Sequence, residues 1–299
     1  MPTKYTIGVD IGATKIVAGL VKGGQIIHRA RFLTKPSQKS GKEAILSTLK
    51  SAIDEVWDKR VSQIGLGLAG TTDSKKATFF HGANFPASFK NISFDLELQR
   101  YQVPICIDND VHCFTLGEAL FGQGKNYQNV FGLTLGTGVG GALVIDKKIF
   151  RGRNNAAGEI GHTIISMTDR QAICGQGFFG HLESYASGSG ISRMIAEQYN
   201  RPFSPEELEK LAKAGDAKAK NIYSLAGHAF AVGCANVVQT INPDVIVVGG
   251  GLARAQDLWR VLRREFRGLI TYPELRSTPI VKSKLLHDAN ILGAANLKI

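Results

Sequence analysis

The sequence predicts an α/β protein made of two similar domains, which arose by internal duplication and face each other across a cleft. Two observations support this prediction. Residues 7–21 (IGVDIGATKIVAGLV) and 131–145 (FGLTLGTGVGGALVI) share one pattern, an apolar strand, a glycine-rich turn and a second apolar strand. After each copy, segments with helical and strand periodicity alternate, as they do in α/β domains. Ligands of paired domains commonly bind in the cleft between them.

The first copy is expected to begin with a meander of three antiparallel strands, of which 24–32 is the third. Helical spacing of apolar residues follows over 43–57. Residues 63–70 and 103–110 have the continuous apolar character of buried parallel strands, and 111–122 is a helix that ends at glycine. We therefore expect a first domain over 1–122.

The second copy repeats this plan in a longer segment. Its third strand is expected over 147–152, and its later elements are a long helix over 222–241, a strand into three glycines over 243–251, a helix over 255–267, a strand over 278–283 and a last helix from Asp288. We expect a second, larger domain over 123–287. The last helix, 288–299, is expected to complete the first domain.

Composition excludes several classes of protein. No apolar run approaches the roughly 20 residues of a membrane helix, and the first residues enter a strand pattern without a signal-peptide layout. The net charge is +11, but the basic residues are scattered, so we expect no nucleic-acid partner. A small anionic substrate such as a nucleotide fits this charge. Four cysteines without framework spacing predict reduced thiols and a cytoplasmic location.

The segment GTGVGG, 136–141, matches the dinucleotide pattern GxGxxG. That pattern requires a helix after the glycines, with its N-terminus facing the pyrophosphate, whereas a strand is expected here. We therefore reject a dinucleotide-binding domain. The two glycine turns have two other interpretations: they are tight hairpins, or they hold phosphate through consecutive backbone N–H groups.

The side chains around the two turns favour phosphate binding. Gly12, Gly136 and Gly138 allow the backbone to approach the phosphate closely, and Thr14 and Thr137 add hydroxyl donors. Lys15 adds a cation, and Asp10 adds a carboxylate that can orient Mg²⁺ or its waters. Two equivalent polar loops, one in each domain, are expected to bind one polyphosphate from opposite sides.

Asp110 lies where a predicted buried strand enters a helix. A carboxylate at this place can accept a proton from an attacking hydroxyl, with an ordinary or depressed pKa that leaves it ionised at neutral pH. It can equally be the N-cap of the helix over 111–122, and the residues alone leave both roles open. The neighbouring Asn109 can both donate and accept hydrogen bonds to a polar substrate.

The motifs, taken together and in order, resemble the ROK family (repressors, open reading frames and kinases) of the actin-like, ribonuclease H-like ATPase superfamily. The matching segments are DIGATK, LGTGVGGALV, IDNDV, AAGEIGH, GHLESYASG and INPDVIVVGGG. The resemblance implies a carbohydrate kinase that transfers a phosphoryl group from ATP, with Mg²⁺, to a hexose or amino-hexose. It makes Asp110 the catalytic base and places Gly250 near the adenosine. It implies sugar contacts from Asn84, Asn109, Asp110, Glu159, His162 and Glu183.

Relatives in this family carry a structural zinc on three cysteines of a CxCGxxGCxE loop and on the histidine of the ExGH motif. The aligned stretch here is CGQGFFGHLE, 174–183, which keeps Cys174 but has Gln176 and His181 in place of two cysteines. His162, Cys174 and His181 supply three donors where a closed site needs four. Two interpretations stay open: a weakened zinc site, or a loop that Phe178 and Phe179 stabilise by apolar burial.

Two other functions remain as alternatives to the kinase. Some relatives are repressors with a DNA-binding segment before the first glycine loop, and because nine residues precede Asp10 in this sequence we expect no such segment here. A sugar-binding homologue with little or no turnover is the second. Substrate choice is expected to depend on loops near 70–95 and 151–165. Relatives often form homodimers, but the sequence shows no interface signal.

Overall fold

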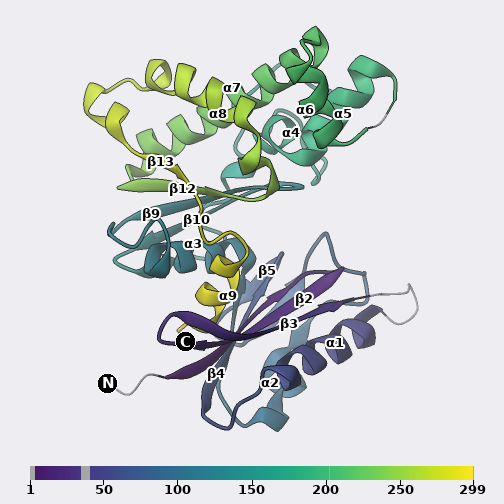
Figure 1. Cartoon of the computed structure of the whole chain (residues 1–299), viewed down its shortest axis with the longest axis vertical. Helices are drawn as coiled ribbons and strands as arrows, with labels where there is room; N and C mark the ends of the chain where they lie inside the picture. The colour runs from purple at the N-terminus through teal and green to yellow at the C-terminus, as the bar shows by residue number, and fades with distance from the viewer. Residues whose placement is uncertain (1–3, 35–40, 202, 299) are drawn as a thin grey trace. The chain divides into compact units, whose positions relative to one another are not determined.

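The computed structural model describes residues 4–34, 41–201 and 203–298. Contacts divide the chain into two units (Figure 1). The first unit consists of Met1–Gln128, Ala142–Ala157 and Ser283–Ile299, and the second of Asn129–Gly141 and Gly158–Lys282. The contacts group 142–157 with the first unit, whereas the repeat in the sequence predicts that they belong to the second domain. The expected boundary at residues 122/123 stays a prediction.

The first unit is built on a five-stranded sheet with the order β3-β2-β1-β4-β8. The first three strands form the expected antiparallel meander, and β4 and β8 continue it in parallel. The strands are β1 (Tyr5–Ile11), β2 (Lys15–Lys22), β3 (Gln25–Leu33), β4 (Val61–Leu68) and β8 (Ile105–Asn109).

The second five-stranded sheet has the order β11-β10-β9-β12-β13. β10 and β11 are antiparallel, and β12 is parallel to both β9 and β13. The order matches that of the first sheet, strand for strand, which confirms the duplicated α/β fold. The strands are β9 (Val130–Leu135), β10 (Val139–Ile145), β11 (Lys148–Phe150), β12 (Val245–Gly249) and β13 (Ile280–Lys282).

Helices cover both faces of the first sheet. Alternate residues of β1, such as Ile7 and Val9, point to one face and join a buried core with Leu49 and Ile53 of α1. The opposite face carries α9, which also packs against α3. The helices of this unit are α1 (Gly41–Glu55), α2 (Phe94–Glu97), α3 (Asp110–Phe121) and α9 (Asp288–Ala295).

Glycine lets α9 lie directly on this sheet. A Cβ at Gly8 would lie 1.9 Å from the Ile291 carbonyl oxygen, and one at Gly65 would lie 1.7 Å from the Ala294 carbonyl oxygen. Backbone cannot retreat from such a contact, so only glycine fits at these two positions. The last helix therefore packs on strands β1 and β4.

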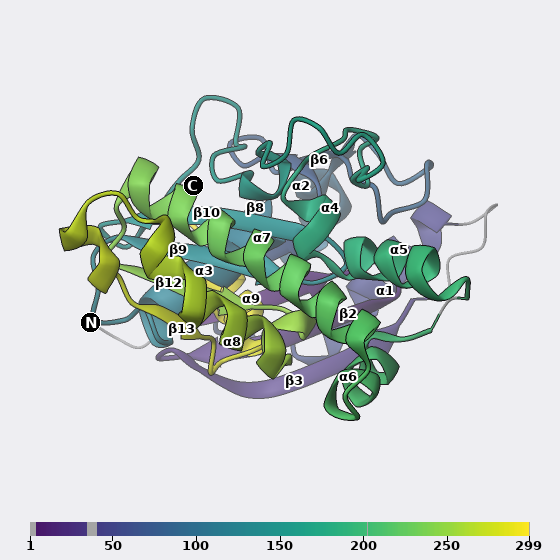
Figure 2. The same cartoon turned by 90° about the horizontal axis from the view of Figure 1, so that it is seen from above.

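The helices of the second unit are dominated by α7, which packs against α8 (Figure 2). Trp259 and Leu262 of α8 are buried, and the Trp259 indole N–H donates to the Ala253 carbonyl oxygen at 2.8 Å. The helices are α4 (Glu183–Ala186), α5 (Gly188–Tyr199), α6 (Pro205–Lys213), α7 (Ala217–Ile241) and α8 (Gln256–Glu265). No helix in the described part of the chain is long and apolar enough to cross a membrane.

The remaining elements are short. A separate three-stranded sheet, with the order β5-β6-β7, follows β4 and was not predicted. Its strands are β5 (Thr71–Asp73), β6 (Thr78–His81) and β7 (Ile92–Ser93). The 3₁₀ turns are η1 (Gln99–Tyr101), η2 (Ile160–His162), η3 (Gly251–Arg254), η4 (Phe266–Leu269) and η5 (Pro273–Ser277).

Candidate functional site

The two glycine turns have matching geometry. Residues 12–14 join β1 to β2, and residues 136–138 join β9 to β10. The Gly12 N–H donates to the Lys15 carbonyl oxygen at 2.9 Å, and the Gly136 N–H donates to the Gly138 carbonyl oxygen at 3.0 Å. Each turn is therefore a short hairpin loop, and hairpin geometry and phosphate binding are compatible interpretations of the same backbone.

Basic residues share a cavity with Asp10, which stands two residues before the first loop. A cavity of about 210 Å³ is lined by Asp10, Lys15, Val17, Arg29, Arg31, His287 and Ile291. Burial raises the pKa of Asp10, while a 3.4 Å hydrogen bond from Asn290 and the charge of Lys15 oppose that rise. Thr14 is exposed at the tip of the loop. The first loop thus combines a carboxylate with cations, a set that suits a phosphate–Mg²⁺ group.

The junction of β8 and α3 separates the two roles that the sequence left open for Asp110. Asn109 is the N-cap of α3: its side-chain oxygen accepts from the Val111 N–H at 2.8 Å, and its side-chain amide donates to the Gly70 carbonyl oxygen at 3.1 Å. Asp110 is the first residue of the helix and accepts from the same Val111 N–H at 3.0 Å. Capping falls mainly to Asn109, which leaves Asp110 as a carboxylate at a helix N-terminus.

The electrostatic setting of Asp110 differs from the expectation of an ordinary or depressed pKa. Burial raises the pKa of Asp110 to about 6, and the neighbouring charge of Asp10 adds to the rise. The hydrogen bond from the Val111 N–H opposes it. The group is still ionised at neutral pH, and a pKa near the working pH suits a general base better than a depressed one.

The Glu183 carboxylate lies against the second glycine loop and is hydrogen-bonded to its end. Its carboxylate accepts from the Val139 N–H at 3.0 Å and from the Gly175 N–H at 3.2 Å. A Cβ at Gly138 would lie 2.3 Å from one Glu183 oxygen, so glycine is needed at this position. Glu183, assigned to sugar contact by resemblance, therefore also joins the second loop to the loop that contains Cys174.

The second loop has two further supports in the same unit. The Gly188 N–H, at the start of α5, donates to the Gly136 carbonyl oxygen at 2.8 Å, and the Ser189 hydroxyl donates to the Thr137 carbonyl oxygen at 2.5 Å. At the end of β12, Gly250 has a φ of 88° and a Cβ there would lie 2.3 Å from the Leu135 carbonyl oxygen. The expected adenosine segment thus lies directly beside the second loop.

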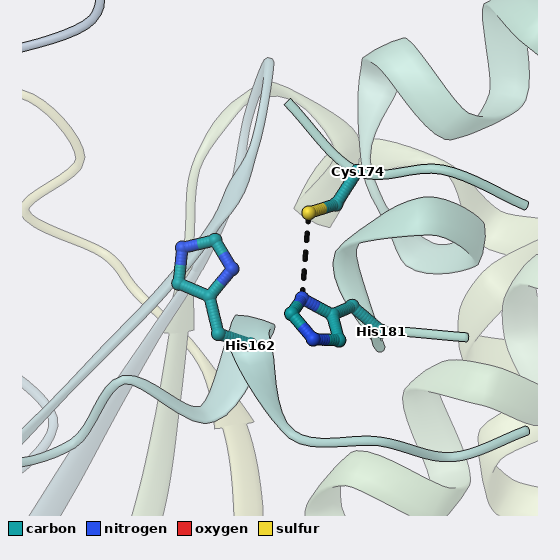
Figure 3. Close-up of side chains that lie close together, drawn as sticks. All are labelled: His162, Cys174 and His181. Atoms are coloured by element: carbon teal, nitrogen blue, oxygen red, sulfur yellow. Dashed lines mark hydrogen bonds between the residues drawn. The ribbon is translucent and has the colours of Figure 1, made fainter. Parts of the chain in front are cut away.

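Three metal-binding side chains converge in the second unit (Figure 3). Ligand atoms of His162, Cys174 and His181 lie within 4.8 Å of one another, and Cys174 Sγ lies 3.3 Å from His181 Nδ1. Nδ1 of His162 is buried without a hydrogen-bond partner among the described residues. Burial, together with the charge of His162, lowers the pKa of His181, which favours the neutral form that binds metals. These donors fit a zinc ion with three protein ligands.

The fourth donor of a closed zinc site is missing from this cluster, since the group contains no fourth His, Cys, Asp or Glu of the described chain. Gln176, in the place of the second cysteine, is exposed. The alternative based on apolar burial is wrong: the exposed fractions of Phe178 and Phe179 are 62% and 38%. Phe178 instead stacks on the His181 ring, with centroids 5.5 Å apart.

The other predicted sugar contacts lie in exposed or half-buried positions. Asn84 is exposed in the turn between β6 and β7, and Glu159 is exposed immediately before η2. Within the first unit the structure thus brings together Asp10, Asn109 and Asp110. Within the second it brings together the glycine loop, Glu183, Gly250 and the His162–Cys174–His181 cluster.

A buried polar network beside Asp110 was not predicted from the sequence. Asp108 has no exposed surface and accepts hydrogen bonds from His112, Arg151 and Asn155. The available signal was the polar triplet Asp108–Asp110 at the end of an apolar strand, since a carboxylate there must find partners when it is buried. Its partners at 151 and 155 had no local signal.

Comparisons with known proteins agree with this geometry. The profile of the ROK family matches residues 6–299. The glucokinase of Thermotoga maritima is 31% identical over 99% of this chain and 98% of its own length. The N-acetyl-D-glucosamine kinase of Citrobacter koseri is 33% identical over 82% of this chain and 84% of its own.

Solved structures give the same result. The ROK hexokinase from Thermus thermophilus has a TM-score of 0.83 and 28% identity, and the match covers 97% of this chain and 96% of that one. A ROK family glucokinase from Streptomyces griseus, solved with glucose and AMPPNP, has a TM-score of 0.79 and 28% identity over 98% of both chains. With a family profile that spans almost every residue and the duplicated actin-like fold, this chain belongs to the ROK family.

Proposed function

We propose that this protein is a carbohydrate kinase that transfers the γ-phosphoryl group of ATP to a hydroxyl of a hexose or N-acetyl-hexosamine. The observation that carries the proposal is Asp110, a carboxylate at the start of α3 with a pKa of about 6, next to the carboxylate of Asp10. The named activities of the relatives, glucokinase and N-acetyl-D-glucosamine kinase, supply the substrate class.

In the proposed reaction, Asp110 accepts the proton of the sugar hydroxyl as its oxygen attacks the γ-phosphorus. The bond between the γ-phosphorus and the bridging oxygen breaks, and ADP leaves with that oxygen and its electron pair. Such a transfer needs alignment and charge neutralisation more than covalent help. Proton acceptance by a positioned base contributes about 10²- to 10⁴-fold in rate.

The loops bind and align the donor. Backbone N–H groups of residues 12–14 and 136–138 are proposed to face phosphate oxygens, and Lys15 neutralises part of their charge. Asp10 would hold Mg²⁺ or its waters, and this ion supplies charge neutralisation on the phosphates. Gly250, beside the second loop, is proposed to leave space for the adenosine.

The acceptor is proposed to contact Asn84, Asn109, Glu159, His162 and Glu183. Nδ1 of His162, which is buried without a hydrogen-bond partner among the described residues, supports this, because sugar rings present hydroxyls that both donate and accept. Zinc on His162, Cys174 and His181 would fix the ring of that histidine. We also propose a cytoplasmic location, which the four buried, unpaired cysteines support.

The test is ADP release with MgATP against a panel of hexoses and N-acetyl-hexosamines, each beside a no-sugar control. We expect sugar-dependent ADP formation from one or two members of the panel. Folded protein that binds sugar without stimulated ADP release would instead favour the sugar-binding homologue. Sugar phosphate must appear in equal amount with ADP, which excludes simple ATP hydrolysis.

A further inference from the structure

Asp108 is the most completely partnered carboxylate near the proposed reaction. It lies in β8 beside Asn109, and its side chain has no exposed surface. Burial of a lone carboxylate is very costly, so its partners must offset the lost hydration. Its four donors are His112 Nδ1 at 2.6 Å, Arg151 Nε at 2.8 Å, Asn155 Nδ2 at 3.2 Å and the Asn109 N–H at 2.9 Å. We call Asp108 and the side chains of His112, Arg151 and Asn155 the Asp108 network.

The network joins segments that are distant in the sequence. Arg151 and Asn155 lie in the loop that follows β11, and Asn155 also donates to the Thr72 hydroxyl at 2.7 Å. Asn109 donates to the Gly70 carbonyl oxygen at 3.1 Å. Residues 70–72 and 151–155 are therefore both hydrogen-bonded to the β8–α3 junction, which also carries Asp110.

The charge of Asp108 holds these donors together. Burial alone would raise the pKa of Asp108, but the hydrogen bond from His112 and the charges of His112 and Arg151 lower it on balance. The group is therefore an anion at neutral pH. Since it is fully enclosed by protein, it cannot touch a sugar or a phosphate.

We propose that Asp108 is a positioning residue that sets sugar affinity and turnover by fixing residues 70–72 and 151–155 against the strand–helix junction that carries Asn109 and Asp110. Residues 70–72 and 151–155 are hydrogen-bonded to the residues that directly precede Asp110, so a change in their position also moves the junction that holds Asp110. A shift of about 1 Å near a reacting group can cost about 10²-fold in rate. The proposal rests on the proposed kinase function.

A purely structural role is the competing explanation, and the chain offers a matched control. Glu118 lies on α3, has no exposed surface, and accepts from the Ser283 hydroxyl at 2.5 Å and from the Gln123 N–H at 2.8 Å. Glu118→Gln removes a buried carboxylate from α3, the helix that follows β8, without touching the Asp108 network. Asp108→Asn and Glu118→Gln should both lower the melting temperature, but only Asp108→Asn should change kcat/KM for the sugar.

The experiment compares Asp108→Asn, Asn155→Ala, their double variant and Glu118→Gln at a temperature where all are folded. In Asp108→Asn an amide N–H₂ group faces hydrogen-bond donors, and we expect a 10- to 100-fold loss of kcat/KM for the sugar with the KM for ATP within about twofold. Asn155→Ala should lose less, and the double variant should be no worse than Asp108→Asn, because both act through one network. Unchanged sugar kinetics in Asp108→Asn, or an equal loss in Glu118→Gln, would overturn the proposal.

Two further measurements keep the test decisive. If Asp108→Asn does not fold, Arg151→Gln replaces it, because that side chain is partly exposed and its loss removes one donor only. Hydrogen exchange of backbone amides at 70–72 and 151–157 should speed up in Asp108→Asn and not in Glu118→Gln. Exchange does not depend on turnover, so unchanged protection refutes the positioning role even if the wild type proves not to be a kinase. An inactive wild type with faster exchange in the variant refutes the kinase alone.

Discussion

The two sheets have the same strand order, but their last strands end differently. β8 is buried over Ile105–Asp108, ends in Asp108–Asn109 and runs directly into α3. β13 has three residues, is partly exposed and is followed by Ser283 and Lys284. The two sheets therefore share a strand order, but the carboxylate and amide side chains that end β8 have no counterpart at the end of β13. The fold determines where side chains gather, and the residues at the end of β8 determine what they can do.

We expect the largest loss of turnover from a change at the end of β8, where the chain enters α3. Asp110→Asn removes the proposed base but keeps the shape, so kcat should fall by about 10²- to 10⁴-fold. Sugar binding, measured by calorimetry, should stay within a few-fold of the wild type. Asp95→Asn, an exposed carboxylate of α2, is the control and should keep full turnover. Retained turnover in Asp110→Asn would remove this residue from the reaction.

The local, repeated parts of the site could be predicted from the sequence. The glycine loops follow from a pattern that occurs twice, and the start of α3 follows from Asp and Asn before a helical segment. The sequence could not show which of Asn109 and Asp110 caps the helix, because both residue types are good N-caps. The extended backbone of Asn109, with φ −61° and ψ 145°, identifies Asn109 as the N-cap.

The tertiary parts of the site could not be predicted. Arg151 and Asn155 reach Asp108 across 43 and 47 residues, and no local pattern encodes such a contact. The alternative interpretation, in which Phe178 and Phe179 are buried, failed because apolar character does not ensure burial in a short glycine-rich loop. Helices α5 and α6 and the small sheet of β5–β7 were missed between the stronger repeats.

The second prediction compares the two glycine loops. A Cβ at Gly136 meets no protein atom within 4 Å, whereas one at Gly12 would lie 3.0 Å from the Lys15 carbonyl oxygen. Gly136→Ala should therefore leave the melting temperature unchanged but raise the KM for ATP about tenfold, if phosphate approaches this backbone closely. Gly268→Ala, also in open space, is the control and should change neither value. An unchanged KM in Gly136→Ala would mean that the second loop is only a hairpin.

The third prediction concerns how kcat/KM for the sugar depends on pH through Asp110, the residue that follows β8. Asp110 must be ionised to accept a proton, and its pKa is raised to about 6 by burial and by Asp10. As the pH falls through 6, the carboxylate becomes protonated, and kcat/KM for the sugar should decrease tenfold per pH unit. Asp10→Asn should shift this limb to lower pH, because it removes the charge that raises the pKa. A limb near pH 4 in the wild type would contradict the buried setting of Asp110, provided that the protein stays folded there.

The smallest expected effect lies in the second unit, at the cluster of His162, Cys174 and His181. Three protein ligands hold zinc less firmly than four, so wild-type protein should lose zinc on dialysis against a chelator. Gln176→Cys restores the fourth donor of the aligned motif and should retain about one zinc per chain, with a melting temperature a few degrees higher. Gln171→Cys, an exposed thiol in the same loop, is the control and should lose zinc as the wild type does. Metal content per chain measures both outcomes. Stoichiometric zinc in dialysed wild-type protein would show that a fourth ligand, outside the three converging side chains, completes the site.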